Sequence, residues 1–345
     1  TYALADVDWA FDRYESVRPR LPLATFPATS LHARDLSDVA DRYDAFILDA
    51  FGVLNVGTTP IPGAVARMAQ LRAMGKRLIV LTNAASYTRA EALAKYRALG
   101  FDFTADEIVS SRDAAVSRLP PGLRWAAIAA AGDSFADIPA DVTDLIDHPD
   151  ALPRADGILF LSSIRWTPDR QARLTAALRD TPRPVIIANP DIVAPREDGL
   201  TVEPGAFAHD LTDATGIACR YFGKPFPDAY DDALARLPGV PRHRIAMVGD
   251  TLHTDVLGGR ARPPAGGHRP PRQRGARRCA SDRQSGGKHA SRRAPIHRYA
   301  RPRRPRQRRL RRRPSAPKAR RAVCLGIRWT STGLQHASAT NARLH

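Results

Sequence analysis

Cysteine is scarce in this chain, and the few that occur exclude several kinds of site. Cys219, Cys279 and Cys324 are widely spaced and form no C-x-x-C pair. Closely spaced, paired cysteines are the usual sign of a disulfide framework or a structural zinc site. The spacing argues against both, and it favours a reducing compartment, so a cytoplasmic location is expected.

Long apolar runs are also missing. No stretch approaches the roughly 20 apolar residues that a membrane-spanning helix needs, so no membrane partner is expected. Near the N-terminus, Asp6, Asp8, Asp12 and Glu15 interrupt the apolar residues, which is unlike a secretory signal. The composition, 43% hydrophobic and 26% charged over 345 residues, predicts a globular chain with room for two domains.

Acidic residues are nearly absent from the last quarter of the chain. Residues 260–345 hold 26 lysines and arginines and one acid, Asp282, whereas residues 1–259 carry a net charge of −7. The overall charge of +18 therefore belongs to a basic tail joined to a mildly acidic region. Arginine and proline dominate this tail, and such a composition cannot bury enough apolar surface to offset its ordering entropy. We expect the tail to be disordered and to contain no strand.

Three interpretations of the tail are open. The first is a nucleic-acid-binding arm, because clustered arginines neutralise phosphates. Nucleic acid is considered as a partner only through this tail. Another is a disordered appendage. The third is the product of a shifted reading frame near Ala261, because the codons of residues 262–270, read one base later, permit Gly-Leu-Leu-Leu-Val-Val-Thr-Val. We favour the third, and resequencing the gene decides it.

Upstream of the tail, short apolar runs alternate with amphipathic stretches. The runs predict strands at residues 46–49, 78–82, 125–131, 157–161, 185–188 and 245–248. Helices are expected at residues 63–74, 89–99 and 228–236, and an earlier one at 7–17 in an N-terminal extension over residues 1–43. Thr88 and Glu91 predict a capping box for the second of these helices. The alternation is typical of a parallel sheet with helices on both faces.

Four short motifs carry side chains suited to chemistry, each at a strand end or in a loop. They are Asp49-Ala50-Phe51-Gly52-Val53-Leu54, Leu81-Thr82-Asn83, Gly223-Lys224-Pro225 and the segment 248–255, which contains Asp250, His253 and Asp255. Ligands bind at the carboxyl ends of strands in an open parallel sheet. A carboxylate there can act as a nucleophile or a metal ligand, and a lysine can neutralise it or a phosphate. The acid pair of the fourth motif suits Mg²⁺, and the histidine between the acids is expected to be solvated.

In this order the motifs resemble those of the haloacid dehalogenase superfamily, over residues 44–259. The long segment between the second and third motifs is similar to the inserted cap of its class IIA group of nitrophenylphosphatases, sugar phosphatases and pyridoxal-phosphate phosphatases. Four segments resemble the return from cap to core in this group: Ala188-Asn189-Pro190-Asp191, Glu203-Pro204-Gly205-Ala206, Thr215-Gly216 and Gly223-Lys224-Pro225. The resemblance implies an α/β fold, with a Rossmann-like core at residues 44–111 and 205–259 around an α/β cap at 112–204. Dimerisation through the cap is a further expectation.

The resemblance also implies an activity, the Mg²⁺-dependent hydrolysis of a small phosphate monoester. Asp49 would be the nucleophile that forms an aspartyl-phosphate. Thr82 and Asn83 would hold the phosphoryl group, and Lys224 would neutralise both it and the nucleophile. Phosphoryl transfer needs little beyond positioning and charge neutralisation, which such groups supply.

The metal ligands implied by the resemblance come from the first and fourth motifs. Asp49, the backbone carbonyl of Phe51 and Asp250 would contact Mg²⁺, and Asp255 would position the outer shell. Two residues near the end of the cap either contact substrate or only cap a loop, Asn189 and Asp191.

Phe51 departs from the pattern. The phosphatases of this superfamily carry a second aspartate two residues after the nucleophile, which protonates the leaving oxygen. Phe51 cannot do so, and loss of a general acid costs on the order of 10²–10⁴-fold in rate, so slow turnover is expected. Two alternatives stay open: a phosphate-ester binder without turnover, and a dehalogenase-like hydrolase, although dehalogenases lack the metal-binding pair seen at Gly249-Asp250.

Overall fold

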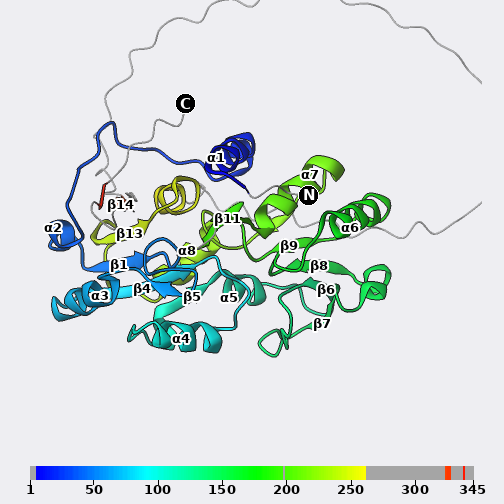
Figure 1. The fold of residues 1–345 in the computed structure, drawn as a ribbon, viewed down its shortest axis with the longest axis horizontal. Helices are drawn as coiled ribbons and strands as arrows, with labels where there is room; N and C mark the ends of the chain where they lie inside the picture. The colour runs from blue at the N-terminus through cyan, green and yellow to red at the C-terminus, as the bar shows by residue number, and fades with distance from the viewer. Residues whose placement is uncertain (1–4, 197–198, 262–322, 328–336, 339–345) are drawn as a thin grey trace, which may run out of the picture. The chain divides into compact units, whose positions relative to one another are not determined.

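The structure is a computed structural model that describes residues 5–196, 199–261, 323–327 and 337–338 (Figure 1). Contacts divide the chain into one compact unit of residues 1–263 and 320–345 and a second unit of residues 264–319. The second unit lies outside the described residues, and so does most of the basic tail. The disorder expected for that tail, and the three interpretations of it, therefore stay predictions.

Six strands form the first sheet, in the order β15-β14-β13-β1-β4-β5. Their bounds are β1 Ala45–Leu48, β4 Arg77–Thr82, β5 Ile108–Ser110, β13 Ile245–Gly249, β14 Val323–Ile327 and β15 Ala337–Ser338. All neighbours pair in parallel except β14 and β15. The three strands that the sequence predicts in this sheet are confirmed to within one residue at each end.

Strand β14 corrects an expectation about the tail. No strand is expected after Gly259, because arginine and proline dominate there, yet Val323–Ile327 pairs in parallel with β13. This run is apolar and carries no charge. The edge of a sheet offers unpaired N–H and C=O groups, so a short apolar run can join it even when its flanks are basic.

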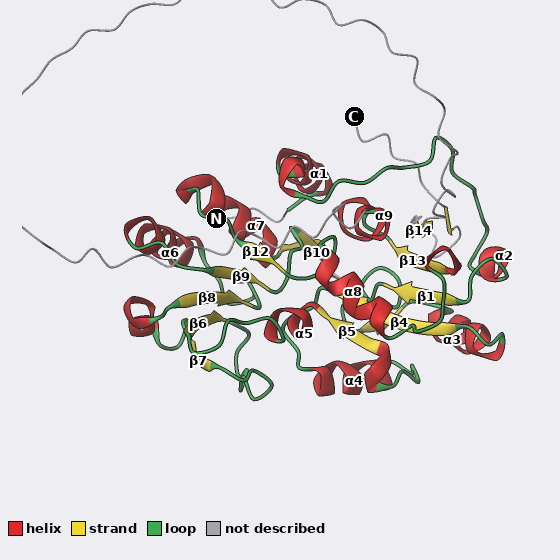
Figure 2. Cartoon of the chain, turned by 180° about the vertical axis from the view of Figure 1, so that it is seen from behind, coloured by secondary structure: helices red, strands yellow, loops and turns green. Residues whose placement is uncertain are grey.

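The strands of the first sheet send alternate side chains to two different hydrophobic layers. Phe46 and Leu48 of β1 pack in one cluster with residues of α3 and α4, whereas Ala45 and Ile47 pack in another with residues of α5 and α8. These helices are α3 Ala64–Ala73, α4 Arg89–Ala98, α5 Ser111–Val116 and α8 Pro227–Ala235. Successive side chains of a strand point to opposite faces, so the sheet is covered by helices on both sides (Figure 2). The predicted α/β fold is thereby confirmed.

Helix α4 begins with the capping box that the sequence predicts. The backbone N–H of Glu91 donates to Thr88 Oγ1 over 3.3 Å, and the backbone N–H of Thr88 donates to Glu91 Oε2 over 2.7 Å. These bonds satisfy two N–H groups that have no partner within the helix. The start of α4 is therefore fixed a few residues beyond Asn83, beside the second motif.

A second sheet of five parallel strands has the order β12-β9-β8-β6-β7. Its strands are β6 Arg124–Ile128, β7 Asp141–Asp144, β8 Gly157–Phe160, β9 Val185–Ile187 and β12 Arg220–Tyr221. One face of the sheet packs in a hydrophobic cluster with α6 Pro168–Asp180 and α7 Pro204–Thr215. Most of this sheet falls in the segment expected as an α/β cap, but β12 lies beyond residue 204, where that segment is expected to end.

The N-terminal segment contacts two distant parts of the chain. Helix α1, Val7–Ser16, confirms the helix predicted at 7–17. Arg13 forms ion pairs with Asp210 and Asp213 of α7, at 2.6 and 2.9 Å. Tyr14 Oη accepts a hydrogen bond from the backbone N–H of Ile192 over 3.1 Å. Residues of this segment also share a hydrophobic cluster with Leu257, just after the fourth motif.

The remaining elements are short. They are α2 Ser37–Ala40, α9 Leu257–Arg260, the hairpins β2 Asn55–Val56 with β3 Thr59–Pro60 and β10 Val193–Arg196 with β11 Gly199–Val202, the 3₁₀ turns η1 Arg18–Arg20, η2 Ala105–Glu107, η3 Pro149–Arg154 and η4 Arg242–Arg244, and the π-helical turn η5 Leu252–Val256. Within the part of the chain that the structure describes, no helix has both the length and the apolar character to cross a bilayer.

Candidate active site

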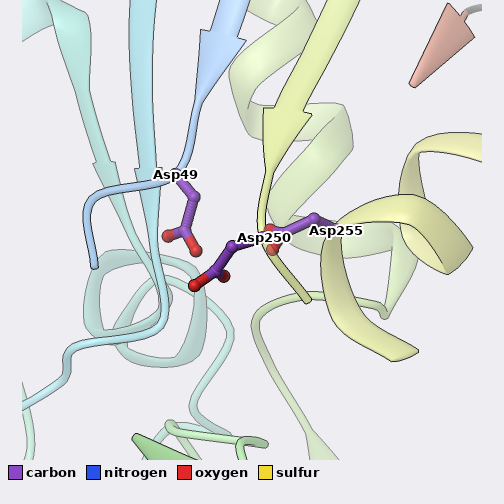
Figure 3. A group of neighbouring side chains, drawn as sticks. All are labelled: Asp49, Asp250 and Asp255. Atoms are coloured by element: carbon purple, nitrogen blue, oxygen red, sulfur yellow. The ribbon is translucent and has the colours of Figure 1, made fainter. Parts of the chain in front are cut away.

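The first and fourth motifs meet at the carboxyl ends of two paired strands. β1 and β13 are in register from Ala45 with Ile245 to Leu48 with Val248, so Asp49 and Asp250 leave the sheet next to each other (Figure 3). Asp255, from turn η5, completes a group in which one oxygen of each carboxylate lies within 4.8 Å of the others. Asp49 and Asp255 are 8% and 0% exposed. Three converging carboxylates offer the oxygen ligands that a hard divalent cation prefers.

Lys224 of the third motif lies between two of these carboxylates. Its Nζ is 2.5 Å from Asp49 Oδ1 and 2.7 Å from Asp255 Oδ1, and the residue is 2% exposed. Burial lowers the pKa of the Lys224 ammonium, but the charges of Asp255 and Asp49 outweigh burial and raise this pKa above its ordinary value. The lysine therefore stays charged at neutral pH.

Burial acts on the carboxylates of this group in the opposite direction, because it raises their pKa values. Burial raises the pKa of Asp49 well above its ordinary value, and the charge of Asp255 adds to this against the opposing effect of Lys224. Burial and the charge of Asp255 also raise the pKa of Asp250, to about 6. One ammonium cannot balance three ionised carboxylates in a buried site, so the group fits a second, metallic cation.

Two glycines allow the carboxylates to approach the backbone. A Cβ on Gly52 would lie 1.8 Å from Asp250 Oδ2, and a Cβ on Gly249 would lie 2.1 Å from Asp255 Cγ. Gly52 also has φ of +80°, a conformation that side chains rarely allow. The loop after Asp49 therefore has no room for a side chain at position 52, because Asp250 occupies that place.

Asp255 uses both of its oxygens within the site. Oδ1 contacts Lys224, and Oδ2 accepts a hydrogen bond from the backbone N–H of Thr251 over 3.1 Å. The carboxylate thus orients the lysine and closes the turn that carries Asp250. These contacts agree with the outer-shell role implied for Asp255, which stays a prediction, as does the carbonyl of Phe51 as a ligand.

The second motif is adjacent to this group, but its two polar residues differ in what they contact. Thr82 Oγ1 accepts a hydrogen bond from the backbone N–H of Ala84 over 3.1 Å. Asn83 Oδ1 accepts from the backbone N–H of Lys224 over 2.7 Å, and its Nδ2 donates to the carbonyl of Lys224 over 2.9 Å. The amide of Asn83 therefore holds the backbone that presents Lys224, while the phosphate contacts predicted for both residues remain to be tested.

The two candidates from the end of the expected cap also reach this region. Asn189 Oδ1 accepts from the backbone N–H of Asp191 over 3.0 Å, and its Nδ2 donates to Glu203 Oε2 over 3.0 Å. These bonds are those of a loop-capping residue. Asp191 Oδ1 instead accepts from Nδ2 of Asn83 over 2.8 Å, which places this carboxylate beside the backbone of Lys224. Whether Asn189 or Asp191 contacts substrate or only caps a loop therefore stays a prediction.

Asp191 provides a test by pH. Burial raises its pKa from 3.8 to about 7, although Lys224 and the hydrogen bond from Asn83 act against the rise. Because the folded pKa lies above the unfolded value, this group's stabilising contribution is complete below about pH 4 and is lost as the pH rises to about 7. Asp191→Asn keeps the acceptor for Asn83 and removes the charge. We expect urea unfolding at pH values from about 4.5 to about 7.5 to show that the free energy of unfolding depends less on pH in the variant than in the wild type. Parallel profiles would contradict the raised pKa of Asp191 in the folded protein.

Two side chains near the site were not predicted from the sequence. Tyr96 of α4 is buried, and burial together with the charge of Asp49 raises its pKa. His253 was expected to be solvated, and this is wrong, because it is 3% exposed. Its ring stacks on Tyr14 with centroids 4.7 Å apart, and its Nε2 lies 2.5 Å from Glu15 Oε1. No local pattern joins the N-terminal helix to the fourth motif, so the sequence offered no signal for this contact.

Models of known families match the two parts of the chain that contribute to this group. A family model described as haloacid dehalogenase-like hydrolase matches residues 46–133, and one described as HAD-hydrolase-like matches residues 221–262. Together these ranges contain all four motifs and every residue of the carboxylate and lysine group.

Individual relatives agree with the family models. The acid sugar phosphatase of Staphylococcus aureus is 27% identical over 218 residues, which cover 63% of this chain and 83% of that protein. A glycerol phosphate phosphatase from Mycobacterium tuberculosis, solved in complex with magnesium, has a TM-score of 0.52 and 28% identity over 64% of this chain. That match spans 65% of the M. tuberculosis chain, slightly less than two thirds of its length. The 4-nitrophenylphosphatase of Thermotoga maritima has a TM-score of 0.53 and 26% identity, over 64% of this chain and 83% of that one.

Proposed function

Because this chain belongs to the haloacid dehalogenase superfamily, as a class IIA-type hydrolase, we propose that it hydrolyses a small phosphate monoester at Asp49. The observation that carries the proposal is the buried contact of 2.5 Å between Asp49 Oδ1 and Lys224 Nζ at the carboxyl end of β1. A carboxylate that is both buried and paired with a fixed ammonium is positioned to attack an anionic phosphorus centre. The phosphatase names of the relatives support the same reaction class.

The reaction has two displacements, and both take place at phosphorus. Asp49 attacks the phosphorus of the bound ester, the bond to the alcohol oxygen breaks, and the phosphoryl group is left on the carboxylate. Water then cleaves this acyl phosphate, which releases inorganic phosphate and restores Asp49. Lys224 neutralises the phosphoryl oxygens in both steps, and the hydroxyl of Thr82 is the nearby donor proposed to hold one of them.

A divalent cation fits beside the nucleophile. Asp49 and Asp250 would contact it. Asp255 would belong to the outer shell, because its carboxylate already contacts Lys224 and accepts a hydrogen bond from Thr251. When bound, Mg²⁺ supplies positive charge that the transferring phosphoryl group needs. The carboxylate of Asp250 beside Asp49 also favours phosphate-ester hydrolysis over the dehalogenase-like alternative, whose fourth motif lacks this ligand.

Phe51 sets the expected substrate range. It has no proton to give to the leaving oxygen, and this absence costs on the order of 10²–10⁴-fold for an alcohol that must be protonated. An aryl ester such as p-nitrophenyl phosphate leaves as a stable anion and needs little protonation. We therefore expect aryl phosphates to be hydrolysed faster than simple alkyl phosphates.

The test is the hydrolysis of p-nitrophenyl phosphate by the full chain, with a search for the covalent intermediate. Nitrophenol release is expected to stop with a chelator and to return with Mg²⁺. Rapid acid quench should trap a hydroxylamine-sensitive phosphoryl group on the peptide that contains Asp49. The absence of both turnover and the trapped group, or its appearance on another residue, would exclude this function.

A further inference from the structure

The turn that carries Asp255 is bonded to a tyrosine of another helix. The hydroxyl of Tyr230, in α8, donates to the backbone carbonyl of Thr254 over 3.1 Å and to that of Asp255 over 3.3 Å. Tyr230 is 8% exposed, so water has little access to these bonds. Both carbonyls belong to the π-helical turn η5. The hydroxyl therefore holds the main chain of a residue in the carboxylate and lysine group.

The backbone of this turn lies between two helical geometries. The backbone N–H of Asp255 donates to the carbonyl of Thr251 over 3.0 Å, with the spacing of an α-helix. The backbone N–H of Val256 donates to the same carbonyl over 3.3 Å, with the wider spacing of a π-helix. π-Helical turns are rare and occur mostly as single turns, so backbone bonding alone favours this geometry only weakly. A contact from outside the turn can select it, and the Tyr230 hydroxyl makes one at Asp255 itself.

The ring of Tyr230 has a fixed place beside the turn. A Cβ on Gly258, in α9, would lie 2.4 Å from Cε2 and 2.5 Å from Oη of Tyr230. Gly258 does not have a positive φ, so a side chain there would displace the ring without straining the backbone. The ring also packs in a hydrophobic cluster with Val256 of the same turn. The packing therefore aims the hydroxyl at the two carbonyls.

The position of Asp255 matters for the rest of the site. Its carboxylate points from the turn toward the end of β13, which carries Asp250 (Figure 3). Oδ1 of Asp255 is 2.7 Å from Lys224 Nζ, and a Cβ on Gly249 would lie 2.1 Å from Asp255 Cγ. With neighbours this close, a shift of the turn would change the contact with Lys224 and the spacing of the carboxylates.

We propose that Tyr230 is a positioning residue for the metal site. Its hydroxyl fixes the main chain at Asp255, and Asp255 in turn places Lys224 and the carboxylates that would hold the cation. Groups behind the ligands of a metal commonly orient them in this way. The inference rests on the proposed function, and it adds a residue from α8 that none of the four motifs contains.

The experiment removes only the hydroxyl. Tyr230→Phe keeps the ring and takes the donor away from the two carbonyls. We expect calorimetry on the full chain to show Mg²⁺ binding about tenfold more weakly, as is typical when a group behind a metal ligand is lost. In the metal-free protein, hydrogen exchange of the backbone amides at residues 252–258 should be about 3–10-fold faster, the size of one neutral hydrogen bond. This second measurement needs neither metal nor substrate.

Two further variants separate this role from general stability. Tyr43→Phe is the matched control, because Tyr43 is also buried, at 5% exposed, but precedes β1 at the end opposite to Asp49. It should change neither Mg²⁺ binding nor exchange at the turn. Gly258→Ala displaces the Tyr230 ring and should reproduce both effects. Its combination with Tyr230→Phe should cost less than the sum of the two, because both act on one contact.

The outcomes distinguish this inference from the proposed function. Unchanged Mg²⁺ affinity in Tyr230→Phe, or unchanged exchange at the turn, overturns the inference. Equal losses in Tyr43→Phe overturn it as well, because they would report a general loss of stability, which thermal unfolding of each variant measures separately. Failure of Mg²⁺ to bind the wild type would overturn the metal in the proposed function. Exchange in the metal-free protein would then still decide whether Tyr230 holds the turn.

Discussion

Asp49→Asn is expected to lower the hydrolysis of p-nitrophenyl phosphate by about 10³-fold or more, and at the same time to stabilise the metal-free protein. The loss of rate follows because the amide cannot attack phosphorus, and removal of a nucleophile abolishes the covalent route. The amide is nearly isosteric with the carboxylate, and Lys224 keeps Asp255 as a partner at 2.7 Å. The substitution therefore removes chemistry without leaving the buried ammonium unpaired.

The gain in stability follows from the charge balance of the site. Burial and the charge of Asp255 raise the pKa of Asp49, so holding Asp49 ionised at neutral pH costs folding free energy. The amide removes this cost. A gain of about 1 kcal/mol would raise Tm by roughly 2–4 °C in a chain of this size. Added Mg²⁺ should raise Tm in the wild type and less in the variant, because a ligand that binds only the folded state stabilises it.

An exposed aspartate serves as the control. Asp150→Asn changes the same functional group on a side chain that is 71% exposed, and it should alter neither the rate nor the response to Mg²⁺. Differential scanning calorimetry with and without Mg²⁺, beside initial rates, checks both expectations. Retention of activity by Asp49→Asn, or equal stabilisation of wild type and variant by Mg²⁺, would contradict the assignment of Asp49 as nucleophile and ligand.

Gly52→Ala is expected to disable the site through a displaced carboxylate. The new Cβ would lie 1.8 Å from Asp250 Oδ2 and 2.4 Å from its Cγ, so Asp250 or the loop after Asp49 must move. Either movement separates Asp250 from Asp49, and we expect activity to fall by about 10²-fold or more, as for a misplaced catalytic group. The rise of Tm with Mg²⁺ should also be lost.

Gly63→Ala is the matched control for this substitution. Gly63 has φ of +81°, almost the same as the +80° of Gly52, but a Cβ there would meet no atom within 4 Å. Both alanines should therefore pay the same cost of a left-handed backbone, about 1–2 kcal/mol. Only Gly52→Ala should lose activity and the response to Mg²⁺. Equal losses in the two variants would show that backbone strain, and not contact with Asp250, explains the glycine in the loop after Asp49.

The elements that the sequence predicts best are those with the strongest local pattern. The sequence predicts β1 from a run of apolar residues and α4 from a capping box, and each signal lies within a few adjacent positions. β7, Asp141–Asp144, was not predicted, because its four residues include two aspartates and resemble a loop. It becomes a strand because β6 offers it a parallel partner from Arg124 to Ala127. Propensity is weak in such short segments, and pairing decides the outcome.

The sequence by itself determined the local chemistry of this protein. A few adjacent positions are enough to show that Asp49 follows an apolar strand and that Gly52 comes soon after it. The same positions show that Phe51 stands where an acid would be expected. Only the tertiary structure decided what these residues meet. Asn83 holds Lys224 across 141 positions, Arg196 reaches Phe51 from a separate hairpin, and Glu15 contacts His253 across 238 positions. Such contacts depend on the order of strands in a sheet and on how helices pack upon it, and no periodicity along the chain encodes them.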